Sequence, residues 1–200
     1  MKLNTIRIED THCQWNDLFS DDELKQIIDY CESVPKIDAI IGTDNRGHSQ
    51  LDQEVRYSKV AWIDRNDQTD WFFHKIQSAS NKLNSKFFGF DVEVLRTIQY
   101  TVYDDTNSHY DWHWDSFVGN ALDNLEDEKQ RKLTSVLQLD DPDDYEGGTL
   151  ELLPCGELKE VERKKGLMIT FPSFVLHRVT PVKSGTRRTL VAWFTGPDWR

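Results

Sequence analysis

The sequence predicts a mainly β chain with flanking helices (α+β), whose strands form a sandwich or barrel. Two stretches, residues 21–32 and 71–87, repeat apolar side chains with helical spacing. The remainder of the chain consists of short alternating runs separated by turn signals, which is typical of antiparallel sheets and not of alternating βαβ units. Its length suits a single domain, residues 1–200. We expect residues 1–91 to support a core formed by residues 92–200.

The first elements are an opening strand between Ile6 and Trp15 and a capped helix. Ser20 and Glu23 have the spacing of a capping box, in which the serine hydroxyl accepts from the amide three residues later and the glutamate reaches back. The helix ends before Pro35. Its apolar face consists of Leu24, Ile27, Ile28 and Cys31.

A polar segment, residues 41–54, follows and contains two glycines. Loops of this length are usually functional or mobile. Val55–Asp64 alternates well enough to form a strand, and Thr69 or Asp70 can cap a second helix. That helix has a broad apolar stripe, made of Trp71, Phe72, Ile76, Ala79, Leu83 and Phe87.

Short strands are expected in the rest of the chain, at about residues 92–103, 110–117, 133–140, 148–153, 166–171, 174–179 and 187–195. Turn-forming sequences separate them, at Asp140-Asp141-Pro142-Asp143-Asp144, Gly147-Gly148, Phe171-Pro172-Ser173 and Lys183-Ser184-Gly185. Residues 119–132 are dense in charge and are expected to form a solvated connection.

Composition narrows the classes of function. The formal charge of -11 opposes binding to a nucleic-acid backbone, which requires Lys and Arg to displace counterions. Three scattered cysteines, Cys13, Cys31 and Cys155, indicate neither a disulfide framework nor a zinc site. No apolar signal segment opens the sequence, and no run reaches the roughly 18 apolar residues of a membrane span. We therefore expect a soluble, cytoplasmic protein without membrane or nucleic-acid partners.

His113 and Asp115 stand two residues apart in an alternating aromatic run, so their side chains are expected on one face. One imidazole and one carboxylate are part of the two-histidine-one-carboxylate triad that binds non-haem Fe(II). His177 lies in another alternating run, where a histidine is more often packed or hydrogen-bonded than a ligand. Arg187 is suited to a bidentate grip on a carboxylate. Alternation lets only one of Arg187 and Arg188 point inward.

The order of these residues resembles the Fe(II)/2-oxoglutarate-dependent oxygenases, in particular their prolyl 4-hydroxylase-like branch. The resemblance covers about residues 92–196, and its motifs are Tyr103, Tyr110, His113 with Asp115, Gly147-Gly148-Thr149-Leu150, Phe171-Pro172-Ser173, His177 and Gly185-Thr186-Arg187. It implies a double-stranded β-helix (jelly roll) with the N-terminal amphipathic helices packed on one sheet. The loop between the two tyrosines departs from the family because it lacks a glycine often found there.

Carried over residue by residue, the resemblance implies that His113, Asp115 and His177 bind Fe(II). Arg187 would hold the distal carboxylate of the co-substrate 2-oxoglutarate. The expected cofactors are Fe(II), 2-oxoglutarate and O2, with ascorbate as a reductant. His109, in the departing loop, is expected to be a loop residue and not a ligand.

Further site residues follow from the same resemblance. Tyr103 stands where the family tyrosine hydrogen-bonds 2-oxoglutarate, and Trp193 where an aromatic ring packs near the pocket. An ordinary aromatic core is the alternative for both, and it suits Trp193 better than Tyr103. Gln138 is a candidate for an additional contact in the pocket. Aromatic packing around the triad is expected from Trp112, Trp114 and Phe117.

The reaction implied is hydroxylation of an unactivated C–H bond, most readily in a prolyl or other residue of a peptide or protein. A free amino acid or small metabolite is an alternative substrate, and a non-catalytic jelly-roll binding module is an alternative of another class. Related enzymes carry a mobile segment that closes over a peptide where residues 41–54 lie. Arg56 or Tyr57 could line the groove beneath it.

Overall fold

The computed structural model describes residues 6–9, 11–39, 41–43, 49–50, 52–116 and 130–198. Its larger sheet contains eight strands, in the order β1 (Ile6–Glu9), β2 (His12–Trp15), β14 (Met168–Pro172), β10 (Gln130–Gln138), β17 (Arg187–Gly196), β8 (Thr97–Tyr103), β7 (Lys59–Asp64) and β3 (Ile37–Asp38). The smaller sheet contains five, in the order β13 (Lys159–Glu160), β12 (Leu150–Leu152), β15 (His177–Val179), β9 (His109–His113) and β6 (Arg56–Tyr57).

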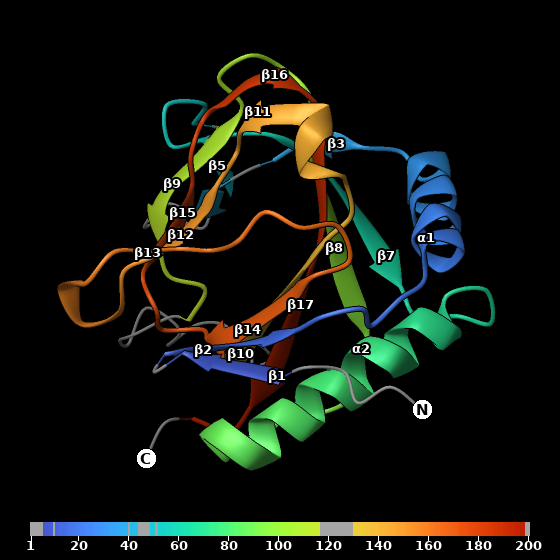
Figure 1. The fold of residues 1–200 in the computed structure, drawn as a ribbon, viewed down its shortest axis with the longest axis vertical. Helices are drawn as coiled ribbons and strands as arrows, with labels where there is room; N and C mark the ends of the chain where they lie inside the picture. Colours follow the sequence, from blue (N-terminus) through green and yellow to red (C-terminus); the bar gives the residue numbers. More distant parts are fainter. Residues whose placement is uncertain are drawn as a thin grey trace.

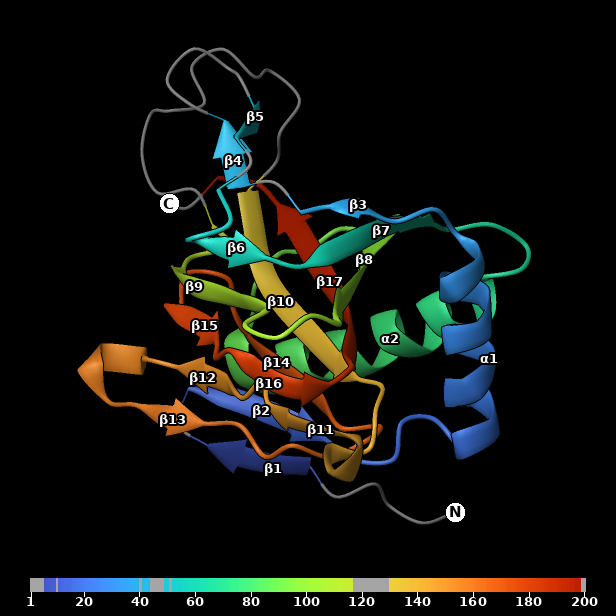
Figure 2. The ribbon, with the colours of Figure 1, turned by 90° about the horizontal axis from the view of Figure 1, so that it is seen from above.

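Two short pairs complete the strands, β11 (Tyr145–Gly147) with β16 (Val182–Gly185) and β4 (Ile41–Thr43) with β5 (Ser49–Gln50). Neighbouring strands run antiparallel within both sheets, and the sheets face each other (Figures 1 and 2). This arrangement is a jelly roll, as the resemblance in the sequence implies. No helix in the described part of the chain is long and apolar enough to cross a membrane.

The first helix, α1 (Asp21–Ser33), begins with the predicted capping box. The Glu23 amide donates to Ser20 Oγ at 3.3 Å, and the Ser20 amide donates to Glu23 Oε2 at 2.8 Å. The second helix, α2 (Asp70–Leu83), starts after Thr69, whose hydroxyl donates to the Asp64 carbonyl instead of capping the helix. A π-helical turn, Asn84–Phe88, extends α2.

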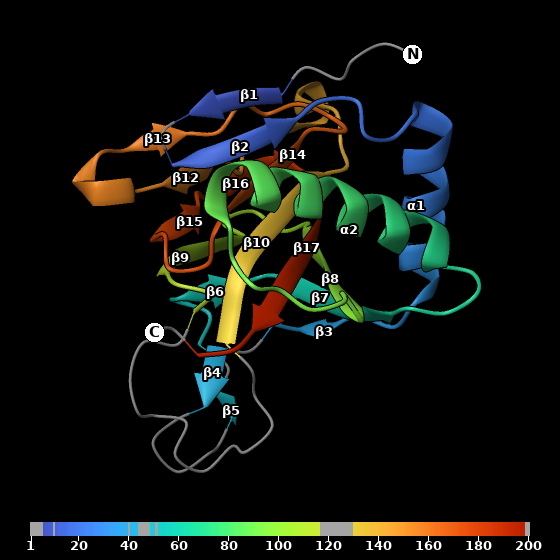
Figure 3. The same ribbon diagram turned by 90° about the horizontal axis from the view of Figure 1, so that it is seen from below.

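Both helices pack on the outer face of the larger sheet, and α2 lies across β14, β10 and β17 (Figure 3). Because side chains alternate along β17, this strand contributes both to the core beneath the helices and to the space between the sheets. One set of its side chains, Leu190, Ala192 and Phe194, is buried beneath the helices. The other set, Arg187, Thr189, Val191 and Trp193, lines a pocket between the sheets.

Several boundaries differ from the sequence prediction. The opening strand is a hairpin of β1 and β2, and the described part of the predicted 41–54 loop contains β4 and β5. Lys183-Ser184-Gly185 belongs to β16 because it pairs with β11, which the turn signals did not reveal. Strand β10 begins at Gln130, inside the predicted 119–132 connection; residues 119–129 lie outside the described residues.

Candidate metal centre

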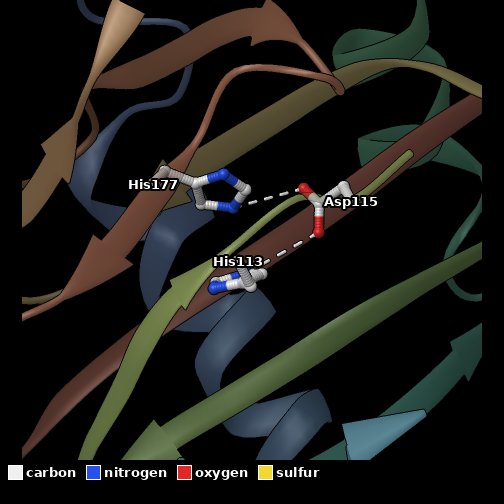
Figure 4. Close-up of side chains that lie close together, drawn as sticks. All are labelled: His113, Asp115 and His177. Carbon is white, nitrogen blue, oxygen red and sulfur yellow. Dashed lines mark ion pairs between the residues drawn. The ribbon is translucent and has the colours of Figure 1, made fainter. Parts of the chain in front are cut away.

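Two histidines and one carboxylate converge between the sheets (Figure 4). His113 ends β9, His177 begins β15, and the two residues lie opposite each other in the antiparallel register. His177 Nε2 lies 3.4 Å from Asp115 Oδ2, and His113 Nε2 lies 3.9 Å from Asp115 Oδ1. The candidate ligand atoms of all three lie within 4.8 Å of one another.

Asp115 reaches the cluster through a turn and not through strand alternation. Strand β9 ends at His113, and the amides of Asp115 and Ser116 both donate to the Ser173 carbonyl at 3.0 Å. The Thr134 hydroxyl on β10 donates to Asp115 Oδ2 at 2.8 Å and also contacts Ser173 Oγ at 2.9 Å. The predicted 110–117 strand is therefore too long, although the expected meeting of His113 with Asp115 is observed.

Backbone carbonyls determine which imidazole nitrogen is free. His113 Nδ1 lies 2.7 Å from the Asp111 carbonyl, and His177 Nδ1 lies 2.8 Å from the Val175 carbonyl. Because a carbonyl oxygen can only accept, each Nδ1 carries the proton. The Nε2 lone pairs are therefore available to a metal ion, an arrangement common among metal-binding histidines.

Burial and neighbouring side chains shift the pKa values of two candidate ligands, His113 and Asp115. Burial lowers the pKa of His113 to about 3, and the adjacent His177 contributes to the decrease. Burial alone would raise the pKa of Asp115, but the neighbouring His177 and His113 hold it below its ordinary value. A neutral imidazole and an ionised carboxylate are the forms that bind metal.

The donor chemistry therefore fits an Fe(II) ion held by three protein ligands with open positions. Within the described ranges, this is the only cluster of at least three His, Cys, Asp or Glu side chains close enough to share an ion. Aromatic rings pack against both histidines of the cluster. Tyr110 stacks on His113 with ring centroids 3.5 Å apart, and Phe171 lies 4.9 Å from the His177 ring.

A pocket adjoins the cluster, and Arg187 is one of the residues that line it. Arg187 is 2% exposed, and its Nε makes no hydrogen bond to a described residue. No carboxylate of a described residue pairs with its guanidinium, which lies 5.2 Å from the centroid of the Tyr103 ring. Arg188 points to the opposite face of β17 and pairs with Asp140, so Arg187 is the inward arginine.

Tyr103 and Trp193 both line the same pocket. Tyr103 is 3% exposed and lies opposite Arg187 in the pairing of β8 with β17. The buried indole Nε1 of Trp193 makes no hydrogen bond of good geometry to a described residue, but it lies close enough to Asp115 to help lower the pKa of that carboxyl. Both residues therefore lie in the pocket that Arg187 lines.

Other expected contacts are absent among the described residues. Gln138 does not line the pocket because its amide donates to the Glu162 carbonyl at 2.7 Å. Trp114 is 61% exposed, and Trp112 lies 4.6 Å from the Arg178 guanidinium instead of packing around the cluster. Alternation explains this difference, because His113 faces the cluster and its neighbours Trp112 and Trp114 therefore face away from it. Phe117 lies outside the described residues.

His109 begins β9, so the expectation of a loop position is wrong, and it lies outside the candidate metal cluster. Its Nδ1 and Nε2 lie 2.7 and 2.9 Å from the carbonyls of Asn107 and Glu54. Asn107 has φ of 72°, the left-handed conformation that glycine adopts most easily and asparagine tolerates. Asparagine thus takes a glycine-like conformation in the loop that departs from the family pattern.

Sequence reasoning missed three polar residues of the pocket, Gln99, Thr101 and Thr134. Gln99, Thr101 and Tyr103 alternate along β8 with buried apolar residues, a period-two signal that could have found the first two. Thr134 has no such local signal, since its role depends on Asp115. Arg56 lines the pocket as suggested, whereas Tyr57 does not; its hydroxyl donates to Asp105 Oδ2 at 3.1 Å.

Sequence comparisons agree with this geometry. The profile of the 2OG-Fe(II) oxygenase superfamily matches residues 98–195. A PKHD-type hydroxylase of Synechococcus sp. is 40% identical over 86 residues, which cover 42% of this chain and 35% of that protein. One of Alteromonas mediterranea is 24% identical over 184 residues, covering 89% of this chain and 75% of that protein. Among the PKHD-type hydroxylases of Hyphomonas neptunium, Synechococcus sp. and Pseudomonas fluorescens, the match covers only 27–37% of their length.

Solved structures show the same fold. A prolyl-4-hydroxylase of Pseudomonas putida superposes with a TM-score of 0.68 at 19% identity, covering 94% of both chains. A prolyl hydroxylase of Trichoplax adhaerens, in complex with a peptide fragment of the hypoxia inducible factor oxygen degradation domain, gives 0.71 at 18% identity. It covers 93% of this chain and 84% of that chain. The predicted jelly-roll fold with flanking helices is confirmed.

Proposed function

This chain belongs to the 2OG-Fe(II) oxygenase superfamily through residues 98–195, and from that premise we propose that it is an Fe(II)- and 2-oxoglutarate-dependent dioxygenase. Its reaction is the hydroxylation of an unactivated C–H bond. One observation carries the proposal: a convergent imidazole–imidazole–carboxylate cluster shares a pocket with a buried arginine that has no carboxylate partner among the described residues.

His113, Asp115 and His177 would hold the iron ion. Each is buried or nearly so, and each is oriented by a backbone or hydroxyl partner, which lowers the cost of assembling the site. Bound Fe(II), with O2 and 2-oxoglutarate, supplies the oxidising chemistry. Tyr110 and Phe171 pack against the two imidazoles and cover part of the cluster.

Arg187 would bind the distal carboxylate of 2-oxoglutarate. A buried guanidinium without a carboxylate is unfavourable, and a bidentate contact with a carboxylate would satisfy it. The orphan Nε of Arg187 supports this role. Tyr103 and Trp193 would contact the same co-substrate, because both line the pocket that Arg187 lines.

The substrate we propose is a prolyl or other residue of a peptide or protein. The solved neighbour from Trichoplax adhaerens contains a bound peptide, which supports a peptide substrate. The name of the relatives, PKHD-type hydroxylases, supports hydroxylation as the reaction. We also propose that residues 1–200 act as one domain. The helices of residues 1–91 share one buried core with β17 and β10 of residues 92–200, which supports a single domain.

The test is turnover measured by mass spectrometry. Protein supplied with Fe(II), 2-oxoglutarate and ascorbate is incubated with a peptide panel and with cell extract. We expect succinate and a peptide product that has gained one oxygen, and neither from the matched His113→Ala variant. Failure of the metal-loaded protein to bind 2-oxoglutarate, together with no succinate, would overturn the proposal in favour of a non-catalytic jelly-roll module.

A further inference from the structure

A second buried arginine, Arg56, lines the same pocket as Arg187. It belongs to β6, where it lies opposite Tyr110 of β9, and it is 7% exposed. Its guanidinium carbon lies 4.4 Å from the centroid of the Tyr110 ring, and Tyr110 stacks directly on His113. One aromatic ring therefore separates this cation from a candidate metal ligand.

Every hydrogen-bond partner of Arg56 within the described part of the chain is neutral. Its Nε donates to Ser58 Oγ at 3.2 Å, and its Nη2 donates to Gln99 Oε1 at 2.8 Å. Its Nη1 makes no hydrogen bond to a described residue, although a guanidinium offers five N–H donors in a fork suited to carboxylates. By contrast, Arg178 and Arg188 both pair with carboxylates, Glu151 and Asp140.

The charges of the pocket do not balance. Its lining contains two guanidinium groups, Arg56 and Arg187, but one carboxylate, Asp115. Fe(II) adds two positive charges and 2-oxoglutarate adds two negative charges, so the loaded pocket keeps one excess positive charge. Burying an uncompensated charge is costly, and a pocket of this kind favours an anionic occupant.

We propose that Arg56 binds a carboxylate of the primary substrate, close to the carbon that is hydroxylated. The proposal rests on the proposed function, because it assigns the excess charge after iron and 2-oxoglutarate are bound. A carboxylate is provided equally by an acidic side chain or C-terminus of a peptide and by a free amino acid. In either case an anionic group would accept a hydrogen bond from Nη1 of Arg56, and the hydrogen bonds of Arg56 to Gln99 and Ser58 would remain.

The test measures binding without turnover. The full chain is loaded with Mn(II) in place of iron and with 2-oxoglutarate, and calorimetry follows matched carboxylate and carboxamide ligands. The pairs are N-acetylproline with N-acetylprolinamide, free proline with prolinamide, and acetylated, amidated Ala-Pro-Asp with Ala-Pro-Asn. We expect the carboxylate member of at least one pair to bind about tenfold or more tightly, as for a charge-assisted contact. The pair that shows it identifies the source of the carboxylate.

Three variants decide the role of Arg56. Arg56→Gln should bring the two members of that pair within about twofold of each other, since the charged contact is lost. Gln99→Glu keeps Arg56 but gives it an internal carboxylate at the position of its present acceptor, and should abolish the preference as well. Lys59→Gln removes an exposed cation outside the pocket, paired with Asp104, and should leave the preference unchanged.

The result separates two failures. If no pair shows a carboxylate preference, or if the preference survives in both Arg56→Gln and Gln99→Glu, the role of Arg56 is overturned while binding of 2-oxoglutarate upholds the proposed function. If the Mn(II)-loaded wild-type protein does not bind 2-oxoglutarate, the proposed function fails and the role of Arg56 fails with it. Retained 2-oxoglutarate affinity in Arg56→Gln shows that this variant is folded.

Discussion

His177 and His113 face each other across the antiparallel pair of β15 and β9, with ring centroids 4.1 Å apart. The register of two strands from distant parts of the sequence thus sets the spacing of the two imidazoles. Because the strands and the Nδ1 contacts with carbonyls fix both rings, the Nε2 atoms converge in the fold itself. A metal ion would then bind with little rearrangement.

We expect His113→Ala to lower the affinity for Co(II), used as an air-stable substitute for Fe(II), by more than about a hundredfold. The loss of even a residue that orients a metal ligand costs 10–100-fold, and this change removes a ligand. Calorimetric and visible-absorption titrations measure it. His109→Ala is the control, because both ring nitrogens of His109 contact carbonyls. Full affinity in His113→Ala would remove His113 from the ligand set.

Thr134→Val should weaken Co(II) binding by roughly tenfold, because Asp115 Oδ2 loses the hydroxyl that orients it while the size of the side chain is kept. The matched change is Thr170→Val, which removes a buried hydroxyl paired with Ser135 and away from the cluster. That variant should lose stability in urea but bind Co(II) normally. Equal Co(II) affinities in the two variants would show that Thr134 is only structural.

Arg187→Ala should weaken the binding of 2-oxoglutarate, whereas Arg188→Ala should lower the stability of the fold. The first removes the proposed partner of 2-oxoglutarate and should weaken its binding to the Mn(II)-loaded protein by about tenfold to a hundredfold. The second leaves the buried Asp140 carboxylate without its ion pair and should lower the free energy of unfolding by about 1–3 kcal/mol. Calorimetry and urea denaturation separate these outcomes. Unchanged 2-oxoglutarate affinity in Arg187→Ala would require another anchor.

Gly148→Ala tests whether the glycine pair positions Arg187. A Cβ at Gly148 would lie 2.7 Å from Arg187 Cδ and 3.0 Å from Val182 Cγ2, and the residue has φ of +60°. We expect weaker 2-oxoglutarate binding, because Arg187 must move, together with reduced thermal stability. Gly156→Ala shares a positive φ of +82° but meets nothing within 4 Å, so it should lower stability alone. Identical 2-oxoglutarate affinities would contradict the positioning role.

The sequence predicts the parts of the site that local patterns control. Alternation along the last strand places Arg187 toward the pocket and Arg188 toward the helices, and both are found there. The capping box of Ser20 and Glu23 is likewise a local contact between residues three apart, and it forms as expected. In each case the relevant partner or direction follows from a few neighbouring residues.

Contacts between distant residues explain what the sequence does not predict. Asp115 is held by Ser173 and Thr134, which come from other strands, so the end of β9 could not be read from its own alternation. The amide of Gln138 is used by the Glu162 carbonyl, a pairing that depends on how β10 meets the following loop.

Acid should destabilise the protein partly through Glu23. Burial opposes the shift, but hydrogen bonds with Lys75 and Ser20 hold the pKa of Glu23 below its ordinary value of 4.5. A carboxyl group whose pKa is lower in the folded state stabilises the fold above its unfolded pKa, and this contribution is lost as the pH falls through the folded pKa. The free energy of unfolding should therefore decrease as the pH drops below 4.5.

Glu23→Gln isolates this effect, because glutamine can still complete the capping box but cannot titrate or pair with Lys75. Near neutral pH the variant should lose up to about 1 kcal/mol, the usual range for a partly exposed ion pair. Its urea-denaturation midpoint should then decline less steeply than that of the wild type as the pH falls below 4.5. Asp22→Asn removes a charge from the same helical turn without an ion pair among the described residues, and should keep the wild-type slope. If both variants keep that slope, the Glu23–Lys75 contact at 2.6 Å does not contribute to acid sensitivity.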